Sequence, residues 1–329
     1  MEMPGNIFLN NDCFSGTCSG VPHTENFYFV GRYHPAHYKG FTPWKRLHEY
    51  EGIPESGSEH TIITQGHGRM IIDSHTHIGT IHDFSITGDM LLRSMRRYGI
   101  GYALVSSVEG AEFDGGTREL EPWKPQITVN EEVAALARAH RHMMKGLFWI
   151  KPRREGWSHE VERFMTEHHD LMAGFKAHPA LSMLNITDER YVPYIRCAER
   201  MGLPFAVHSA PDEFSPPRAV YDTAQRFPGV NFIMVHMGLG TDNTEAARYI
   251  RELPNLYGDT SWVTAEHVLD AVRECGSGKI LFGTDAPIDG EDTYQSYSDM
   301  IAMLRRELSA HEFDDVFRGN ALRLFRLEV

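Results

Sequence analysis

From residue 69 onward, short apolar runs rich in Val, Ile, Phe and Leu alternate with longer stretches of helical periodicity. This alternation is typical of repeated βα units that build a parallel sheet. We predict eight strands, at about 69–75, 101–108, 146–151, 172–178, 204–209, 231–236, 255–260 and 279–285. Eight strands in strict alternation with helices favour a closed (β/α)₈ TIM barrel, and an open doubly wound sheet is the alternative.

Two of the intervening segments indicate how their helices begin, end and pack. Thr87 is suited to N-cap one helix, and Gly99 to stop it at the C-terminal end. In another segment, apolar residues spaced i, i+3, i+4 and i+7 form one face that can cover the sheet: Tyr191, Tyr194, Ile195 and Ala198.

Residues 1–68 differ from the rest of the chain. They are rich in Gly, Pro, Asn and Ser and contain only short strand-like runs. We therefore expect two parts, a short irregular N-terminal extension over 1–68 and a barrel domain over 69–329.

The composition favours a small-molecule substrate. The chain has 329 residues, 41% hydrophobic and 23% charged, which suits an ordinary soluble protein with a large core. Its formal charge of −13 is spread along the sequence, and such a field repels phosphate backbones, so we expect no nucleic-acid partner.

No stretch resembles a signal peptide or approaches the roughly 18 apolar residues that span a bilayer, so we expect a cytoplasmic protein without membrane contact. The cysteines match no disulfide framework or zinc knuckle, and we interpret them as reduced thiols: Cys13, Cys18, Cys197 and Cys275. The sequence leaves open whether the protein forms a homo-oligomer.

A pair of histidines ends the first predicted strand, in IIDSHTHIG. Residues two apart on a strand point to the same side, so His75 and His77 can both face the barrel mouth and suit a divalent ion such as Zn²⁺. His140 and His142 have the same spacing. They end a helical run, however, where positions two apart diverge by about 200°, so that pair cannot chelate.

Three further polar residues end otherwise apolar strands: His208 in PFAVHSA, His236 in NFIMVHMG and Asp285 in KILFGTDAP. The C-terminal ends of barrel strands are where barrel enzymes place their catalytic residues, and a buried His or Asp there needs a partner. Each residue alone is more often structural. Together with the first-strand pair, they predict a metal site.

At these residues the sequence resembles the amidohydrolase superfamily, and in particular the amidohydrolase-related branch of small metal-dependent hydrolases and decarboxylases. The resemblance covers roughly residues 70–329, through DSHTH, GFKAHP, the two strand-end histidines, FGTDAP and GNALRLFRL. It implies that His75, His77, His208 and Asp285 are metal ligands, that Asp285 also accepts a proton, and that His236 acts beside the metal as acid or base.

Other strand-end residues allow more than one role. Lys176 in GFKAHP is a carboxylated bridge between two ions, as in binuclear relatives, or a cation that holds a substrate carboxylate or carbonyl; for Lys176 and His178 alike, structural packing is the alternative. His178 is a second candidate for substrate contact, and Asp259 either lines the pocket or anchors the following loop. Ser106, Ser107 and Lys151 are plausible contacts at other strand ends.

The resulting hypothesis is a hydrolase in which one divalent ion, Zn²⁺ or Mn²⁺, activates water against an amide, ester or lactone carbonyl. The nearest alternative is a non-oxidative decarboxylase with the same site. A metal-dependent deoxyribonuclease of the TatD type is disfavoured by Lys176 and by the acidic charge. A catalytically silent scaffold is disfavoured because every expected ligand type is present.

Overall fold

The computed structural model describes residues 70–81, 84–115 and 117–329, so the expected extension over 1–68 lies outside the described residues. Within these ranges, one sheet has the strand order β2-β1-β3-β4-β5-β6-β7-β8-β9. The parallel strands of this described part are β1 (Ile71–Ile81), β3 (Ile100–Ser107), β4 (Met144–Trp149), β5 (Met172–Ala177), β6 (Phe205–His208), β7 (Phe232–Val235), β8 (Leu256–Asp259) and β9 (Ile280–Leu281). All eight overlap the predicted runs.

The sheet closes into a barrel through main-chain hydrogen bonds between β1 and the segment that follows β9. The Ser74 N–H donates to the Phe282 carbonyl at 2.9 Å, and the Asp285 N–H donates to the His75 carbonyl at 2.8 Å. First and last parallel strands are thus joined, which confirms the (β/α)₈ barrel and rules out the open sheet.

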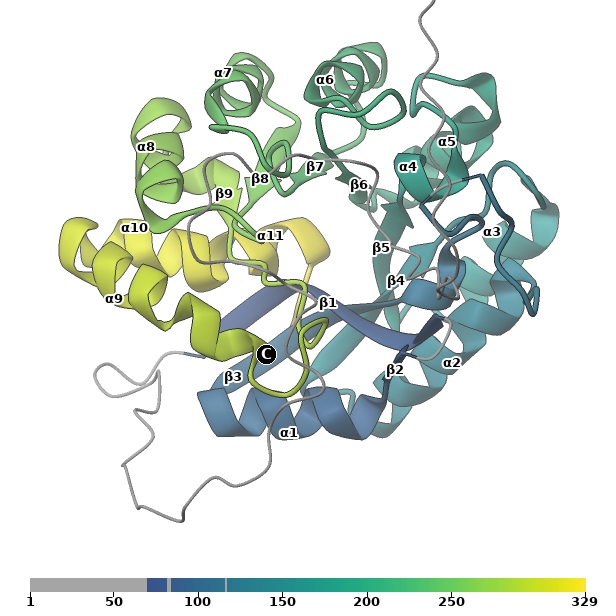
Figure 1. Ribbon diagram of the computed structural model, residues 1–329, viewed down its shortest axis with the longest axis horizontal. Coiled ribbons are helices and arrows are strands. Elements are labelled where there is room, and N and C mark those ends of the chain that lie inside the picture. Colours follow the sequence, from purple (N-terminus) through teal and green to yellow (C-terminus); the bar gives the residue numbers. More distant parts are fainter. Residues whose placement is uncertain (1–69, 82–83, 116) are drawn as a thin grey trace, which may run out of the picture.

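Helices surround the strands (Figure 1). The α-helices in the described ranges are α1 (Gly88–Tyr98), α2 (Gln126–Ala139), α3 (His159–Glu167), α4 (Pro179–Ser182), α5 (Val192–Met201), α6 (Pro217–Arg226), α7 (Thr244–Glu252), α8 (Ala265–Cys275), α9 (Ser298–Glu307), α10 (Ala310–Asp314) and α11 (Asn320–Phe325). The predicted ends of α1 are confirmed, because the Thr87 hydroxyl accepts from the Met90 N–H at 3.1 Å and Gly99 has φ 71°. The predicted apolar face of α5 is buried.

Two apolar layers hold the barrel together. Alternate strand residues pack outward against the helices, while the others fill the interior, among them Ile72, Leu147 and Leu281. Side chains of α11, including Leu324 and Phe325, join the interior layer and close the end where the strands begin. Each fully buried Leu, Ile or Phe stabilises the fold by about 1.5–3 kcal/mol. Buried polar side chains lie at the opposite end of the barrel, where the strands finish.

One expected loop is partly a hairpin. The first strand was predicted to end at about residue 75, but β1 continues to Ile81 and pairs antiparallel with β2 (Phe84–Ile86). Ile86 is buried against Val108 and Trp149, which explains why the segment folds back.

None of the described helices has the length and apolar character that a bilayer crossing requires. Cys197 and Cys275 are free thiols, as predicted, and the other two cysteines lie outside the described residues.

Candidate metal centre

His75 and His77 reach the same side of β1 with the help of an irregularity in that strand. The register of β1 against β3 shifts after Asp73, where two β1 residues face the single β3 residue Leu104, and His77 then pairs with Ser106. Such bulges re-aim side chains and are common beside active sites. Both imidazoles are buried, and their Nε2 atoms lie 3.0 Å apart.

Asp285 joins the two histidines at the barrel mouth. Its Oδ1 lies 3.1 Å from His75 Nε2 and 2.7 Å from His77 Nε2. These three atoms form one of the two groups of potential metal ligands in the described residues. At metal–ligand distances of about 2.0–2.2 Å, neighbouring ligand atoms of one ion lie about 3 Å apart. The observed separations therefore fit a shared cation.

The backbone at this end of the barrel is held in unusual conformations. Asp285, His236 and Trp262 have φ angles of 69°, 65° and 59°, in the left-handed region that side chains other than Gly rarely adopt. Each such residue costs of order 1–3 kcal/mol, and such residues cluster at functional sites. Trp262 also donates its indole N–H to Asp285 Oδ2 at 2.7 Å, which orients the carboxylate.

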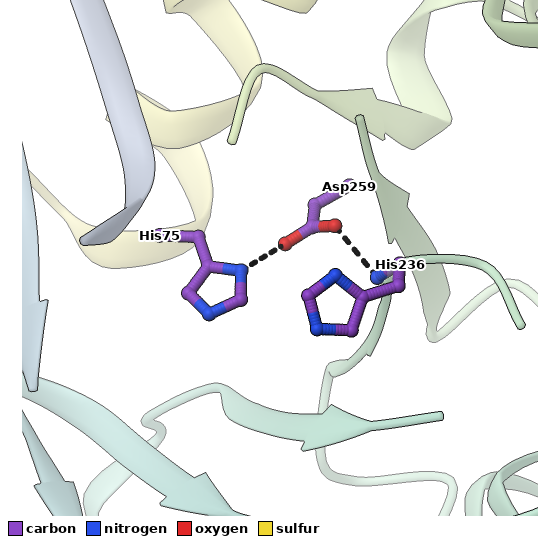
Figure 2. Close-up of side chains that lie close together, drawn as sticks. All are labelled: His75, His236 and Asp259. Atoms are coloured by element: carbon purple, nitrogen blue, oxygen red, sulfur yellow. Dashed lines mark hydrogen bonds and ion pairs between the residues drawn. The ribbon is translucent and has the colours of Figure 1, made fainter. Parts of the chain in front are cut away.

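Asp259, at the end of β8, holds the His75 ring from its other nitrogen (Figure 2). Its Oδ2 lies 3.0 Å from His75 Nδ1, and its Oδ1 accepts from the Ser261 hydroxyl at 2.7 Å. Burial would raise the pKa of Asp259, but hydrogen bonds and the nearby imidazoles outweigh burial and lower the pKa to about 2. Of the two roles left open by the sequence, the structure favours anchoring: Asp259 holds Ser261 of the following loop and, in addition, the His75 ring.

His236 is tied to the same carboxylate. Its backbone N–H donates to Asp259 Oδ1 at 2.8 Å (Figure 2), and its ring Nδ1 lies 2.8 Å from the Ser261 hydroxyl. His75, His236 and Asp259 form the second group of potential metal ligands in the described residues. Burial lowers the pKa of His236 to about 4, so the ring is neutral at pH 7. A neutral imidazole beside the ligand set can accept or relay a proton.

Lys176 projects across the barrel interior toward the same point. It comes from β5, which does not pair with β1, and its Nζ lies 3.0 Å from His75 Nε2. Burial lowers the pKa of Lys176 to about 8, although Asp285 and Asp259 oppose this effect. The amine is therefore placed either to meet a substrate or to be modified, and both predicted roles remain open.

His208 and His178 pack against each other rather than against the ligand group. Their rings stack at 3.7 Å between centroids and 14° between planes. The His208 ring is 4.9 Å from that of His236, but His208 joins neither group whose ligand atoms all lie within 4.8 Å of one another. His178 Nδ1 accepts from the Leu181 N–H at 3.2 Å and caps α4. The structure thus brings three of the four predicted ligands together. His208 lies outside this group, next to the His236 ring.

The donor chemistry of the site fits a divalent cation. His75 Nδ1 faces the Asp259 carboxylate and His77 Nδ1 faces the Ser106 carbonyl at 3.3 Å, so both Nδ1 atoms carry the ring hydrogens. The two Nε2 lone pairs and Asp285 Oδ1 then face one another as three acceptors. Burial and Lys176 lower the pKa of His75, but Asp285 and Asp259 raise it above its usual value. The site attracts positive charge, as a metal site should.

Sequence reasoning missed several residues that shape this site. Ser261 and Trp262 lie two and three residues after Asp259, and their position just past a strand end was the only available signal. Trp149 ends β4, and its ring lies 5.6 Å from that of His77. A Trp at the end of an apolar strand is indistinguishable from a core residue in sequence.

Comparison with known proteins supports the family resemblance inferred from the sequence. The model of the amidohydrolase family matches residues 72–327, which is most of the chain. No curated protein matches the chain in sequence.

Several solved structures share the fold. The 5-carboxyvanillate decarboxylase of Novosphingobium aromaticivorans, solved with manganese and 4-hydroxy-3-methoxy-5-nitrobenzoic acid, is 14% identical with a TM-score of 0.59 over 79% of this chain and 97% of its own. A 2,6-dihydroxybenzoate decarboxylase from Rhizobium is 17% identical, with a TM-score of 0.58 over 78% and 99%. An amidohydrolase from Burkholderia multivorans with bound zinc is 14% identical, with a TM-score of 0.61 over 79% and 100%.

At these identities the solved structures establish the fold, and the family model establishes the relationship. The matched range includes the histidine pair of β1 and the aspartate after β9, whose side chains meet at the barrel mouth. The chain therefore belongs to the amidohydrolase family of enzymes.

Proposed function

We propose that this chain is a metal-dependent hydrolase that activates water against the amide, ester or lactone carbonyl of a small molecule. The convergence of His75 Nε2, His77 Nε2 and Asp285 Oδ1 within 3.1 Å of one another carries this proposal. These residues would hold one divalent cation, Zn²⁺ or Mn²⁺. His208 would be the fourth ligand, which requires its ring to turn away from His178.

A bound divalent cation lowers the pKa of water and polarises a carbonyl oxygen. Asp285 serves as the proton acceptor. Burial would raise its pKa, but His75 and His77 hold the pKa well below its usual value, so the carboxylate is ionised at neutral pH. Its Oδ2, steadied by the Trp262 indole, takes the proton from the attacking water and later passes it to the leaving group.

His236 and Lys176 act on the substrate side. The neutral His236 ring carries its hydrogen on Nδ1, which faces the Ser261 hydroxyl and carbonyl, so its Nε2 lone pair is suited to accept a proton on the substrate side and relay it. The Lys176 amine holds the substrate carbonyl or carboxylate near His75. Because these groups are buried, their interactions with the reacting atoms are stronger than they would be in water.

Non-oxidative decarboxylation is the second candidate, and the buried Lys176 amine favours it. An amine within 3.0 Å of His75 Nε2 can hold a carboxylate that is to be lost as CO₂. Two of the similar structures are decarboxylases of aromatic acids. In this reaction a protonated side chain supplies the proton that replaces CO₂, and His236 is placed to relay it.

Product analysis distinguishes the two reactions. The zinc- or manganese-loaded protein is incubated in H₂¹⁸O with amides, esters, lactones and aromatic acids. Hydrolysis places ¹⁸O in a new carboxylate, whereas decarboxylation releases CO₂ and incorporates a solvent proton. We expect ¹⁸O incorporation that is lost in Asp285→Asn and retained in His142→Ala, a matched histidine variant of the exposed surface. Release of CO₂ alone would replace hydrolysis with the second candidate, and undiminished turnover by Asp285→Asn would contradict both.

A further inference from the structure

The buried indole N–H at the end of β4 and the ammonium of Lys151, two residues further on, have no hydrogen-bond acceptor among the described residues. The Trp149 indole N–H has no partner although Trp149 is only 2% exposed. The Lys151 side chain is 1% exposed, and its Nζ makes no hydrogen bond or ion pair with the described part of the chain. Native proteins leave few such groups unsatisfied, because a buried donor that gives up its hydrogen bonds to water and gains no acceptor destabilises the fold.

The Trp149 side chain is held in one orientation, in which its indole N–H has no hydrogen-bond acceptor. Asn130 forms reciprocal hydrogen bonds with the Trp149 main chain, at 2.9 Å to the N–H and 3.0 Å to the carbonyl. Gly110 lies so close that a Cβ there would come within 2.1 Å of the indole. The ring also stacks on His178 at 5.8 Å between centroids and 10° between planes. The indole cannot easily turn to find another acceptor.

Lys151 lies two residues beyond Trp149, just past the end of β4, and Ile150 between them packs into the helix-facing core. Because side chains alternate along an extended chain, Trp149 and Lys151 are expected on the side opposite to Ile150. The ammonium lies 4.1 Å over the Trp123 ring. The nearby carboxylate of Glu112 instead accepts the backbone N–H groups of Arg153 and Arg154.

The Lys151 amine remains largely protonated at pH 7 although it is buried. Burial lowers the pKa of Lys151 to about 8, with Glu112 and Glu155 opposing the effect, so most of the population is cationic at pH 7. A cation–π contact supplies only part of the stabilisation that a buried ammonium loses with its water. An anionic ligand would supply the remainder.

We propose that Trp149 Nε1 and Lys151 Nζ form a recognition subsite for a substrate carboxylate beside the metal centre. The substrate is then a small carboxylic acid whose reacting carbonyl lies at the metal ligands while its carboxylate lies at β4. The position fits, because the Trp149 ring is 5.6 Å from the ring of the proposed ligand His77. This inference rests on the proposed function, since it names the substrate class of the same site.

Calorimetric binding of matched acids and amides tests the subsite. Acetate is compared with acetamide and benzoate with benzamide, on metal-loaded and metal-free full-length protein. We expect at least one acid to bind the wild type tenfold or more tightly than its amide, in both forms of the protein. Lys151→Met should abolish this preference, and Lys151→Arg should retain it. Replacing Trp149 by benzothienylalanine, which keeps the fused rings without the N–H, should weaken binding of the acid severalfold.

Controls separate this proposal from the metal proposal and from loss of folding. Lys145→Met, near the start of β4, should bind the acids as the wild type does. Lys151→Met should raise Tm by roughly 2 °C or more, because it removes a buried unpaired charge. Equal binding of acids and amides by the wild type, or an unchanged preference in Lys151→Met, overturns the subsite whatever the metal content. Tighter binding of inorganic phosphate than of both acids overturns the carboxylate assignment.

Discussion

Asp259 holds the imidazole of His75 by the nitrogen that faces away from the proposed cation. Asp259 Oδ2 lies 3.0 Å from His75 Nδ1, while His75 Nε2 lies 3.1 Å from Asp285 Oδ1. The carboxylate thereby fixes the tautomer that leaves the Nε2 lone pair available. Outer carboxylates of this kind orient ligand histidines and increase their basicity.

Asp259→Asn should therefore weaken metal binding by about 10–100-fold without removing a ligand. The amide keeps the shape of the side chain but cannot stabilise the Nδ1–H tautomer with a negative charge. Competition with a fluorescent zinc chelator measures the affinity. Wild-type affinity in this variant would show that the 3.0 Å contact does not tune the site.

Lys176→Met tests whether this lysine bridges two ions or stands beside one. An amine 3.0 Å from His75 Nε2 repels a cation at the ligand set as long as it is protonated. If Lys176 acts as an amine, its removal should leave one ion per chain and tighten metal binding at pH 7 at least tenfold. If it is a carboxylated bridge, the variant should lose ions relative to the wild type, and bicarbonate should no longer affect metal content.

Asp73 should stabilise the metal-free protein less as the pH rises toward neutrality, because its carboxyl group is buried. Burial raises the pKa of Asp73 to about 7, against hydrogen bonds from Thr284 and His75 that lower it. A carboxyl whose folded pKa exceeds the unfolded value of about 3.9 stabilises the fold when protonated, and this contribution is lost as the pH rises through about 7. The loss is on the order of a few kcal/mol.

Asp73→Asn should flatten this dependence. The unfolding free energy is measured with guanidinium at pH 5, 6, 7 and 8 in the presence of a chelator. The free energy of unfolding of the wild type should fall relative to that of the variant as the pH rises from 5 to 7, and the difference should level off between pH 7 and 8. Parallel curves would mean that Asp73 does not carry the pH dependence.

Gly110→Ala should destabilise the protein through Trp149. The added methyl group would meet three atoms of the Trp149 side chain at 2.1–2.7 Å, and the indole is buried with nowhere to move. Overpacking of this kind costs about 1–3 kcal/mol. Gly278→Ala is the matched control, because its Cβ would meet only an Arg323 atom at 3.8 Å. Thermal unfolding of both variants tests the contrast, which equal Tm values would contradict.

The strands could be placed from sequence because buried parallel strands appear as continuous apolar runs. The last strand is the exception. The run 279–285 predicts a full strand, but regular pairing with β8 ends at Leu281. Beyond it the chain turns toward β1, and Asp285 adopts a left-handed conformation that no residue pattern reveals.

The candidate site was predictable only in part, because its geometry depends on contacts between distant segments. The histidine pair and Asp285 could be chosen by their strand-end positions. The bond between His75 and Asp259 joins residues 184 positions apart, and sequence spacing gives no indication of it. The stacking of His208 on His178 was equally hidden, since both residues were expected at the mouth without any indication of mutual contact.

Metal content after exhaustive dialysis against zinc-containing and then zinc-free buffer tests the central claim most directly. The wild type and His142→Ala should retain one zinc ion per chain by elemental analysis. His77→Ala and Asp285→Asn should retain less than a tenth of that amount, with circular dichroism spectra like that of the wild type. Equal zinc in all four proteins, or none in the wild type, would contradict a cation shared by the side chains that meet at the barrel mouth.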